Sequence, residues 1–173
     1  MGRQPPRLPE ERTRILDVRE FLRKFKFVAI DTNVLIAFLA DEPLADKIAP
    51  IIDAVANKHT HQLAVSTLVF AECAIRPYKE GNWEALDKIK LTLQMPNLAL
   101  IPMDMTVAEE AAKIRAIYNL KMPDAIIIAT AVVCKADVLL TNDHELPVVD
   151  ELIVVKTEHL IAPKNSKSPH GKK

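Results

Sequence analysis

Short apolar runs alternate with longer stretches of helical periodicity along most of the chain. Five runs predict buried strands, because each is almost continuously apolar rather than alternating between apolar and polar positions. They are residues 25–30, 62–66, 98–102, 137–142 and 152–156. The stretches between them mostly repeat apolar residues at three- and four-residue intervals, as amphipathic helices do. The helices predicted in this way are residues 33–40, 44–58, 67–78, 82–95, 104–120 and 122–135.

Alternation of strands and helices predicts an α/β fold with three layers, a five-stranded parallel sheet between two layers of helices. Prolines and a cap residue refine the ends of the helices. We expect one helix to stop near Pro77 and another near Pro96, and Asp104 to cap the helix that follows it.

The two ends of the chain differ from this central pattern. Residues 8–24 have an amphipathic helical pattern, so we expect residues 1–26 to form an N-terminal extension that is helical. The last residues, 163–173, are rich in lysine and small polar residues and predict a disordered basic tail. The domain itself is expected to occupy residues 27–162.

Composition indicates one compact domain, since 49% of the 173 residues are hydrophobic and only three are glycine. The net charge of zero conceals an uneven distribution. Residues 1–30 carry eight basic and four acidic residues, and residues 164–173 carry four lysines and no acid. The body between them has a net charge of −8. Basic ends on an acidic body fit a polyanionic partner and a cation-binding pocket, and they fit ordinary solvated ends equally well.

Several classes of protein are disfavoured. The apolar runs are too short to span a membrane, and the N-terminus lacks the apolar centre of a signal peptide. Cys73 and Cys134 have no His or Cys partner at zinc-binding spacing, so they are interpreted as reduced thiols in a cytoplasmic protein.

Four acidic residues stand at unusual places in this pattern. Asp31 ends the first strand, Glu72 lies among apolar helical residues, Asp124 lies in the first turn of a helix and Asp143 follows the fourth strand. Each has a structural explanation alone: a helix cap for Asp31, a pair with Arg76 for Glu72, the helix dipole for Asp124 and a turn for Asp143.

Together, the four acids point to one site, because sites in parallel sheets lie beyond the carboxyl ends of the strands. Four carboxylates that converge cannot all stay ionised without a cation. Oxygen ligands favour hard divalent ions, so Mg²⁺ or Mn²⁺ is the expected cofactor.

The segments AIDTNVLI, ECAIRP, MPDAIIIATA and DVLLTND, in this order, resemble the four acidic motifs of the PIN domain, especially those of VapC-type toxin ribonucleases. The resemblance covers residues 27–160. It implies a metal-dependent ribonuclease whose acidic cluster is Asp31, Glu72, Asp124 and Asp143. It further implies that Asn33, Thr141 and Ser66 are polar neighbours that orient ligands or water.

Phosphodiester chemistry suggests a role for each acid. A bound Mg²⁺ neutralises the phosphate and makes hydroxide available near neutral pH. Asp31 and Asp124 are the preferred direct ligands, Asp143 completes that site or binds a second ion, and Glu72 binds metal through water or positions the nucleophile. Basic residues near this region are candidates for RNA contacts, namely Arg76, Lys79 and Lys121. The resemblance also implies a homodimer and brings an antitoxin protein into consideration as a partner.

Three alternatives remain open at this stage. The fold could serve as a catalytically silent module that binds RNA or protein. DTNV after a strand faintly resembles the nucleophile motif of haloacid-dehalogenase phosphatases, although Asn33 stands where that motif has its second Asp. A receiver domain also places an Asp at a strand end, but neither an early acidic pair nor a late Lys is clear. His59 and His61 are interpreted as residues of a solvated loop, and Trp83 as a packing residue.

Overall fold

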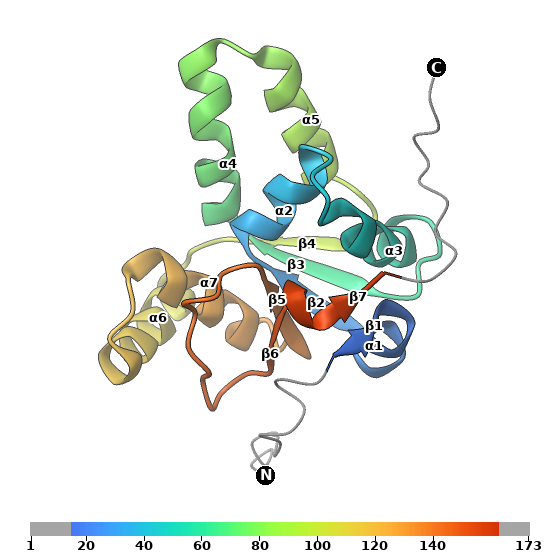
Figure 1. The fold of residues 1–173 in the computed structure, drawn as a ribbon. Coiled ribbons are helices and arrows are strands. Elements are labelled where there is room, and N and C mark those ends of the chain that lie inside the picture. Colours follow the sequence, from blue (N-terminus) through green and yellow to red (C-terminus); the bar gives the residue numbers. More distant parts are fainter. Residues whose placement is uncertain (1–14, 163–173) are drawn as a thin grey trace, which may run out of the picture.

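A parallel sheet of five strands forms the centre of the molecule in the computed structural model, which describes residues 15–162 (Figure 1). The strand order is β4-β3-β2-β5-β6, with every neighbouring pair parallel. The strands are β2 (Phe27–Ile30), β3 (Gln62–Ser66), β4 (Leu98–Ile101), β5 (Val138–Thr141) and β6 (Val154–Lys156). The predicted α/β fold with a five-stranded parallel sheet is therefore confirmed.

Helices cover both faces of this sheet (Figure 1). Helices α2 to α5 lie on one side, and α6 and α7 pack closely together on the other. Their bounds are α2 Thr32–Leu39, α3 Ala45–Ala56, α4 Thr67–Glu80, α5 Trp83–Leu93, α6 Met105–Tyr118 and α7 Met122–Val133. Helix α7 is buried along Ala125–Ala131, because it packs against the sheet and against α6.

The order of the strands fixes the place where a site can form. From β2 the chain adds β3 and then β4 on one side, and it returns to add β5 on the other side of β2. The crevice beyond the carboxyl ends of β2 and β5 is therefore the switch point of the sheet, where ligands of such folds bind. Asp31 directly follows β2, and Asp143 comes two residues after β5.

One predicted helix end is wrong. Helix α4 does not stop near Pro77 but continues to Glu80, with Pro77 buried inside it. Proline in a helix removes one hydrogen bond, and here the buried side chain and the turns on both sides keep the helix intact. The helix ends instead at Gly81, whose left-handed φ of 64° allows Asn82 N–H to bond to the Pro77 carbonyl at 2.9 Å. The predicted cap by Asp104 is confirmed, since its Oδ1 accepts from Val107 N at 3.0 Å.

The N-terminal extension is only partly helical where it is described. Instead of one helix over residues 8–24, it contains a short strand β1 (Leu16–Asp17) and helix α1 (Val18–Lys24). Asp17 ends the strand and caps the helix by accepting from Arg19 N at 2.7 Å, which explains why the helix starts there. Residues 1–14 and the predicted tail, 163–173, lie outside the described residues.

A second, two-stranded parallel sheet joins this extension to the other end of the domain. Strand β1 pairs with β7 (Leu160–Ile161), which follows a short 3₁₀ helix, η1 (Thr157–His159). His61 also contacts α1, since its Nε2 lies 2.7 Å from the Leu22 carbonyl. Its Nδ1 lies 2.8 Å from Thr60 Oγ1. The interpretation of His61 as a solvated loop residue is therefore wrong, since it is only 7% exposed.

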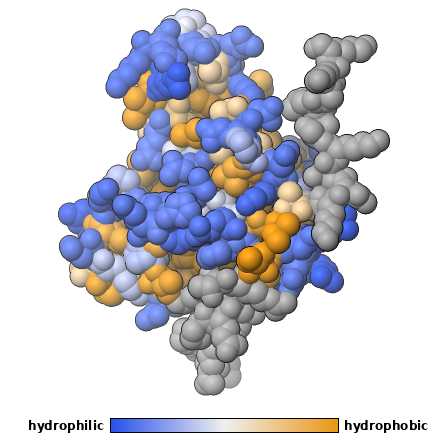
Figure 2. Space-filling model, in the orientation of Figure 1, coloured by the Kyte–Doolittle hydropathy of each residue, from blue (hydrophilic) through white to orange (hydrophobic). Residues whose placement is uncertain are grey.

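Two further observations concern the surface. Within residues 15–162 no single helix is both long and apolar enough to cross a membrane, and only the bent pair of α6 and α7 meets that test together. Trp83 is 63% exposed beside Tyr78 at the tip of the α4–α5 hairpin, so it is not the packing residue that was predicted. Figure 2 shows apolar residues scattered among polar ones on the face in view.

Candidate active site

The four predicted acidic residues line one pocket at the switch point of the sheet. They arrive from different elements, because Asp31 follows β2, Glu72 lies on α4, Asp124 begins α7 and Asp143 follows β5. Asn33 is also in the lining, as expected. The complete lining is Asp31, Thr32, Asn33, Glu72, Pro123, Asp124, Ile127, Asp143 and Leu146. The pocket thus has an acidic side and a small apolar side.

Asp31 is the most constrained of the acids. Its Oδ1 accepts from Val34 N at 2.8 Å, which makes it the cap of α2, and its Oδ2 accepts from Thr141 Oγ1. The backbone N–H of Asn142 also acts on this carboxylate and lowers its pKa. Burial raises the pKa of Asp31, and these hydrogen bonds act in the opposite direction. Asp31 therefore caps α2 and lines the pocket with the same carboxylate.

Thr141 links the two acids that follow the central strands. Besides donating to Asp31, its Oγ1 accepts from Asp143 N at 2.9 Å. Asp143 Oδ1 in turn accepts from Glu145 N at 2.8 Å, so the expected turn at Asp143 is present. The fully buried Thr141 hydroxyl thus fixes the spacing between Asp31 and the segment that carries Asp143.

Asp124 faces the charges of the other acids. Desolvation raises its pKa first, the charge of Asp143 raises it further, and Lys121 lowers it. Glu72 adds a smaller repulsive contribution. The carboxylates therefore act on one another electrostatically across the pocket, which is the condition that a cation would relieve.

Glu72 has a different partner from the one expected. Its Oε2 accepts a hydrogen bond from Thr32 Oγ1, whereas Arg76 Nε bonds to Glu80 Oε1 at 2.8 Å. The structural alternative, a pair of Glu72 with Arg76, is therefore not formed, because Arg76 makes this i,i+4 pair further along the same helix. Thr32 was missed as a site residue, although its position directly after Asp31 placed it at the same strand end.

Not every predicted residue reaches the pocket. Ser66 is 2% exposed and caps α4 by accepting from Leu68 N at 3.3 Å, so it is not part of the lining. Arg76 and Lys79 are exposed on α4 and also lie outside the lining. Lys121 immediately precedes α7 and acts on the pocket through its charge near Asp124.

The donor atoms suit a hard divalent cation, because every acidic group at the pocket offers carboxylate oxygens. Within residues 15–162, no three or more His, Cys, Asp or Glu side chains are already gathered into a metal-binding cluster. Mg²⁺ keeps several of its waters and can be bound through one or two carboxylates. The carboxylates that line the pocket suit such a hydrated ion.

The fold and this acidic pocket define an α/β protein with a carboxylate site at the switch point of its sheet. A model of the PIN domain family matches residues 28–152, most of the chain, so the protein belongs to the PIN domain family. The comparison with curated proteins gave no match.

Several solved structures share this fold. VapBC2 from Rickettsia felis, bound to a DNA fragment from its promoter, superposes with a TM-score of 0.62 at 18% identity, over 75% of this chain and 98% of that one. FitAcB from Neisseria gonorrhoeae gives 0.60 at 22% identity, over 77% and 99%. A toxin–antitoxin complex from Klebsiella pneumoniae gives 0.58 at 22% identity, over 73% and 95%. At these identities the likeness concerns the fold.

Proposed function

We propose that this protein is a metal-dependent ribonuclease that hydrolyses RNA phosphodiester bonds. The observation that carries the proposal is the convergence of Asp31, Glu72, Asp124 and Asp143 on one pocket. Membership of the PIN domain family supports it. A similar structure described as a toxin–antitoxin complex supports a toxin role and an antitoxin partner for this chain as well.

Each acid has a distinct task in this proposal. A bound Mg²⁺ or Mn²⁺ would supply charge neutralisation at the phosphate and an activated water. Asp31 and Asp124 would hold that ion, and Asp143 would complete the site or hold a second ion. Glu72 would orient the attacking water, with its own carboxylate kept in place by Thr32.

Asn33 argues against the phosphatase alternative. It lines the pocket where the phosphatase motif has its second Asp, so the acid of that motif is missing here. We therefore expect no covalent aspartyl-phosphate intermediate.

The test is RNA cleavage by purified protein with Mn²⁺ and with excess chelator. Asp31→Asn should abolish cleavage while keeping the fold, because an Asn side chain also caps a helix. Asp53→Asn is a matched control. Asp53 lies on α3, is not part of the pocket lining and pairs with Lys58 at 2.6 Å. Full cleavage by the wild type in excess chelator would contradict the proposal. RNA binding without cleavage under either condition would favour the silent binding module.

We also propose that the protein forms a homodimer, since large apolar side chains remain exposed on several helices. Leu91 is 69% exposed, Met105 82% and Ile117 65%. Scattered exposed apolar residues are common, but side chains of this size favour burial against a partner. Light scattering should report twice the mass of the 19.3-kDa chain. A monomer across the micromolar range would refute this part of the proposal.

A further inference from the structure

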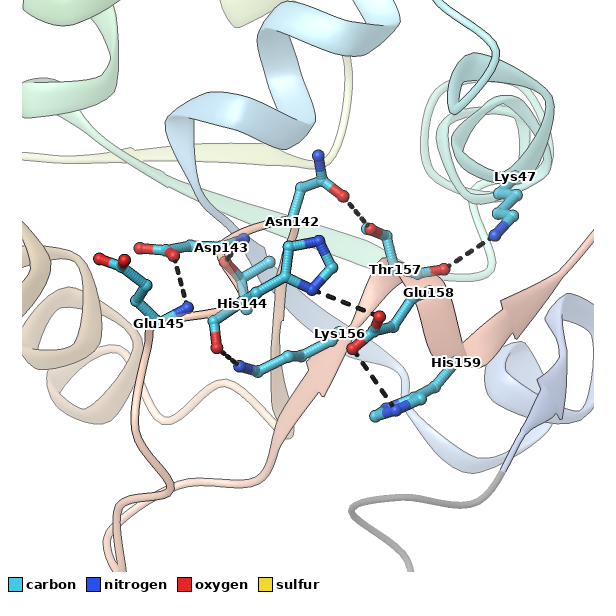
Figure 3. A network of polar contacts seen from close by, with 10 residues as sticks. Lys47, Asn142, Asp143, His144, Glu145, Lys156, Thr157, Glu158 and His159 are labelled. Carbon is cyan, nitrogen blue, oxygen red and sulfur yellow. Dashed lines mark hydrogen bonds and ion pairs between the residues drawn. The ribbon is translucent and has the colours of Figure 1, made fainter.

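Hydrogen bonds connect the segment beside the pocket to η1 and to α3 (Figure 3). Asn142, between Thr141 and Asp143, accepts at its Oδ1 a hydrogen bond from Thr157 Oγ1. Thr157 is 1% exposed and begins η1. Its carbonyl accepts from Lys47 Nζ on α3 at 3.1 Å. Thr157 is therefore held through its backbone by α3 and contacts Asn142 through its hydroxyl.

Asn142 occupies a position that matters for two of the acids. Its backbone N–H is one of the groups that lower the pKa of the Asp31 carboxylate, and the next residue along the chain is Asp143. Thr141, the residue before it, also donates to Asp31. A change in the backbone at Asn142 would thus move a donor to Asp31 and the carboxylate of Asp143 together. The Thr157 hydroxyl is the contact that anchors the Asn142 side chain from outside this segment.

The position of Thr157 depends on elements beyond the matched family segment, which ends at residue 152. Thr157 lies just before β7, whose Leu160 pairs with Leu16 of β1. Helix α1 follows β1 directly, and its Val18 and Phe21 are fully buried. The small sheet is consequently anchored in the core, and it restrains η1 from the C-terminal side.

We propose that Thr157 is a positioning residue for the acidic site, acting through Asn142 on Asp31 and Asp143. This inference rests on the proposed function, because it assigns those two carboxylates to metal binding. Some groups do not bind the metal but orient the side chains that do. Removing such a group lowers metal affinity by about 10- to 100-fold. A residue with only a structural role would lower stability and leave metal affinity unchanged.

The experiment measures Mn²⁺ binding to the full-length protein from the electron paramagnetic resonance signal of free Mn²⁺, alongside RNA cleavage over a range of Mn²⁺ concentrations. Thr157→Val removes the hydroxyl while nearly conserving shape, and Thr157→Ser retains it. We expect the valine variant to bind Mn²⁺ about tenfold more weakly and the serine variant to bind close to wild type. Cleavage by the valine variant should need a correspondingly higher Mn²⁺ concentration.

Thr130→Val is the matched control. Thr130 is as buried as Thr157, and its hydroxyl donates to the Ile126 carbonyl within α7 at 2.7 Å, without a contact to the acids. This variant should lose stability and keep the Mn²⁺ affinity of the wild type. An equal loss of affinity in Thr130→Val and Thr157→Val would overturn the inference, because general destabilisation would then explain both.

The remaining outcomes separate the two proposals. Wild-type Mn²⁺ affinity in a folded Thr157→Val variant would overturn the positioning role alone. Should that variant fail to fold, Asn142→Ala, at a partly exposed residue, removes the same contact from the other side. Wild-type affinity in Asn142→Ala would again overturn the inference. A wild-type protein that does not bind Mn²⁺ would overturn the proposed function and this inference with it.

Discussion

At the scale of single residues, the acidic pocket combines structural and chemical roles in the same side chains. Asp31 caps α2 and lines the pocket, and Asp124 stands in the first turn of α7, where the helix dipole favours a negative charge. Local stabilisation of this kind allows the chain to keep carboxylates close together although they repel one another. The pKa of Asp124 remains raised all the same.

The raised pKa of Asp124 predicts opposite effects of Asp124→Asn with and without metal. The pKa of Asp124 in the folded state lies above the ordinary value of 3.8. The folded state therefore binds the carboxyl proton of Asp124 more tightly than the unfolded state does. Stability contributed by Asp124 is therefore lost as the pH rises through the interval between the unfolded and folded pKa values. Without metal at neutral pH, the asparagine variant should unfold at a higher temperature than the wild type. The gain should stay below about 1 kcal/mol, because solvent screens a partly exposed carboxylate.

Thermal unfolding between pH 4 and 8, in chelator and in Mn²⁺, measures both effects. The advantage of Asp124→Asn in chelator should shrink as the pH falls toward 4. In Mn²⁺ the order should reverse, since a bound ion stabilises the folded wild type by mass action. Asp87→Asn on the exposed side of α5 serves as the control. A variant that is less stable than the wild type in chelator at every pH would contradict the prediction.

At the scale of elements, the ends of the helices decide how the acidic residues are presented. Helix α4 carries Glu72, continues through Pro77 and stops at Gly81. Gly81 has a φ of 64°, and a Cβ placed there would meet nothing within 4 Å. The requirement for glycine at this position is thus conformational rather than steric.

Gly81→Ala should lower the free energy of unfolding by about 1–2 kcal/mol, the cost of a left-handed conformation for a residue with a side chain. Urea denaturation measures this change. Asn119 ends α6 with a φ of 53° and provides the comparison. Asn119→Gly should be neutral or slightly stabilising, because glycine adopts this conformation without strain. Unchanged stability in Gly81→Ala would mean that the hairpin tip relaxes to another conformation.

Features with a regular local signal could be predicted from the sequence. Buried parallel strands are continuously apolar, so an acid such as Asp31 at the end of a run marks both the strand end and a site. The strands β1 and β7 could not be predicted, because two residues carry no periodicity and their partners are far apart in the chain. The hydrogen bond from Thr157 to Asn142 escapes prediction for the same reason. The exposure of Trp83 depends on how far the α4–α5 hairpin projects, which is a tertiary property.

At the scale of the whole molecule, charge is separated between the body and the ends of the chain. Residues 31–163 carry eleven basic and nineteen acidic residues, whereas the last ten residues carry four lysines and no acid. An acidic body attracts cations, such as the one proposed for the pocket, and repels the phosphates of RNA. The basic ends are the natural place for compensating contacts with phosphate, although residues 164–173 lie outside the described part of the chain.

Deleting residues 164–173 should weaken binding of single-stranded RNA and flatten its salt dependence. The log–log slope should fall by up to about 0.7 for each phosphate contact that is lost. Turnover at saturating RNA should hardly change, because the deletion removes no group from the pocket. RNA binding at two salt concentrations measures the effect. A full-length variant with the four lysines replaced by glutamine should behave like the deletion, since it differs from the wild type in charge alone.

Superimposable binding curves for the wild type and the deletion would show that the tail makes no phosphate contact. The path of the RNA would then be sought on the domain itself. Lys121, whose charge acts on Asp124, would be the first residue to replace, followed by Lys79 and Arg76 on α4.

The pairing of Leu16 with Leu160 has a consequence for the newly made protein. Synthesis proceeds from the N-terminus, so β1 leaves the ribosome long before its partner strand has been translated. The five-stranded sheet can begin to assemble during that interval, whereas Thr157 and the two-stranded sheet of β1 and β7 form after it. If Thr157 positions Asp31, the acidic site reaches its working geometry only after residue 157 has been translated. A chain interrupted before residue 157 would then carry all four acids and still lack an ordered metal site, which would keep unfinished copies of the proposed ribonuclease inactive beside the messenger that encodes them.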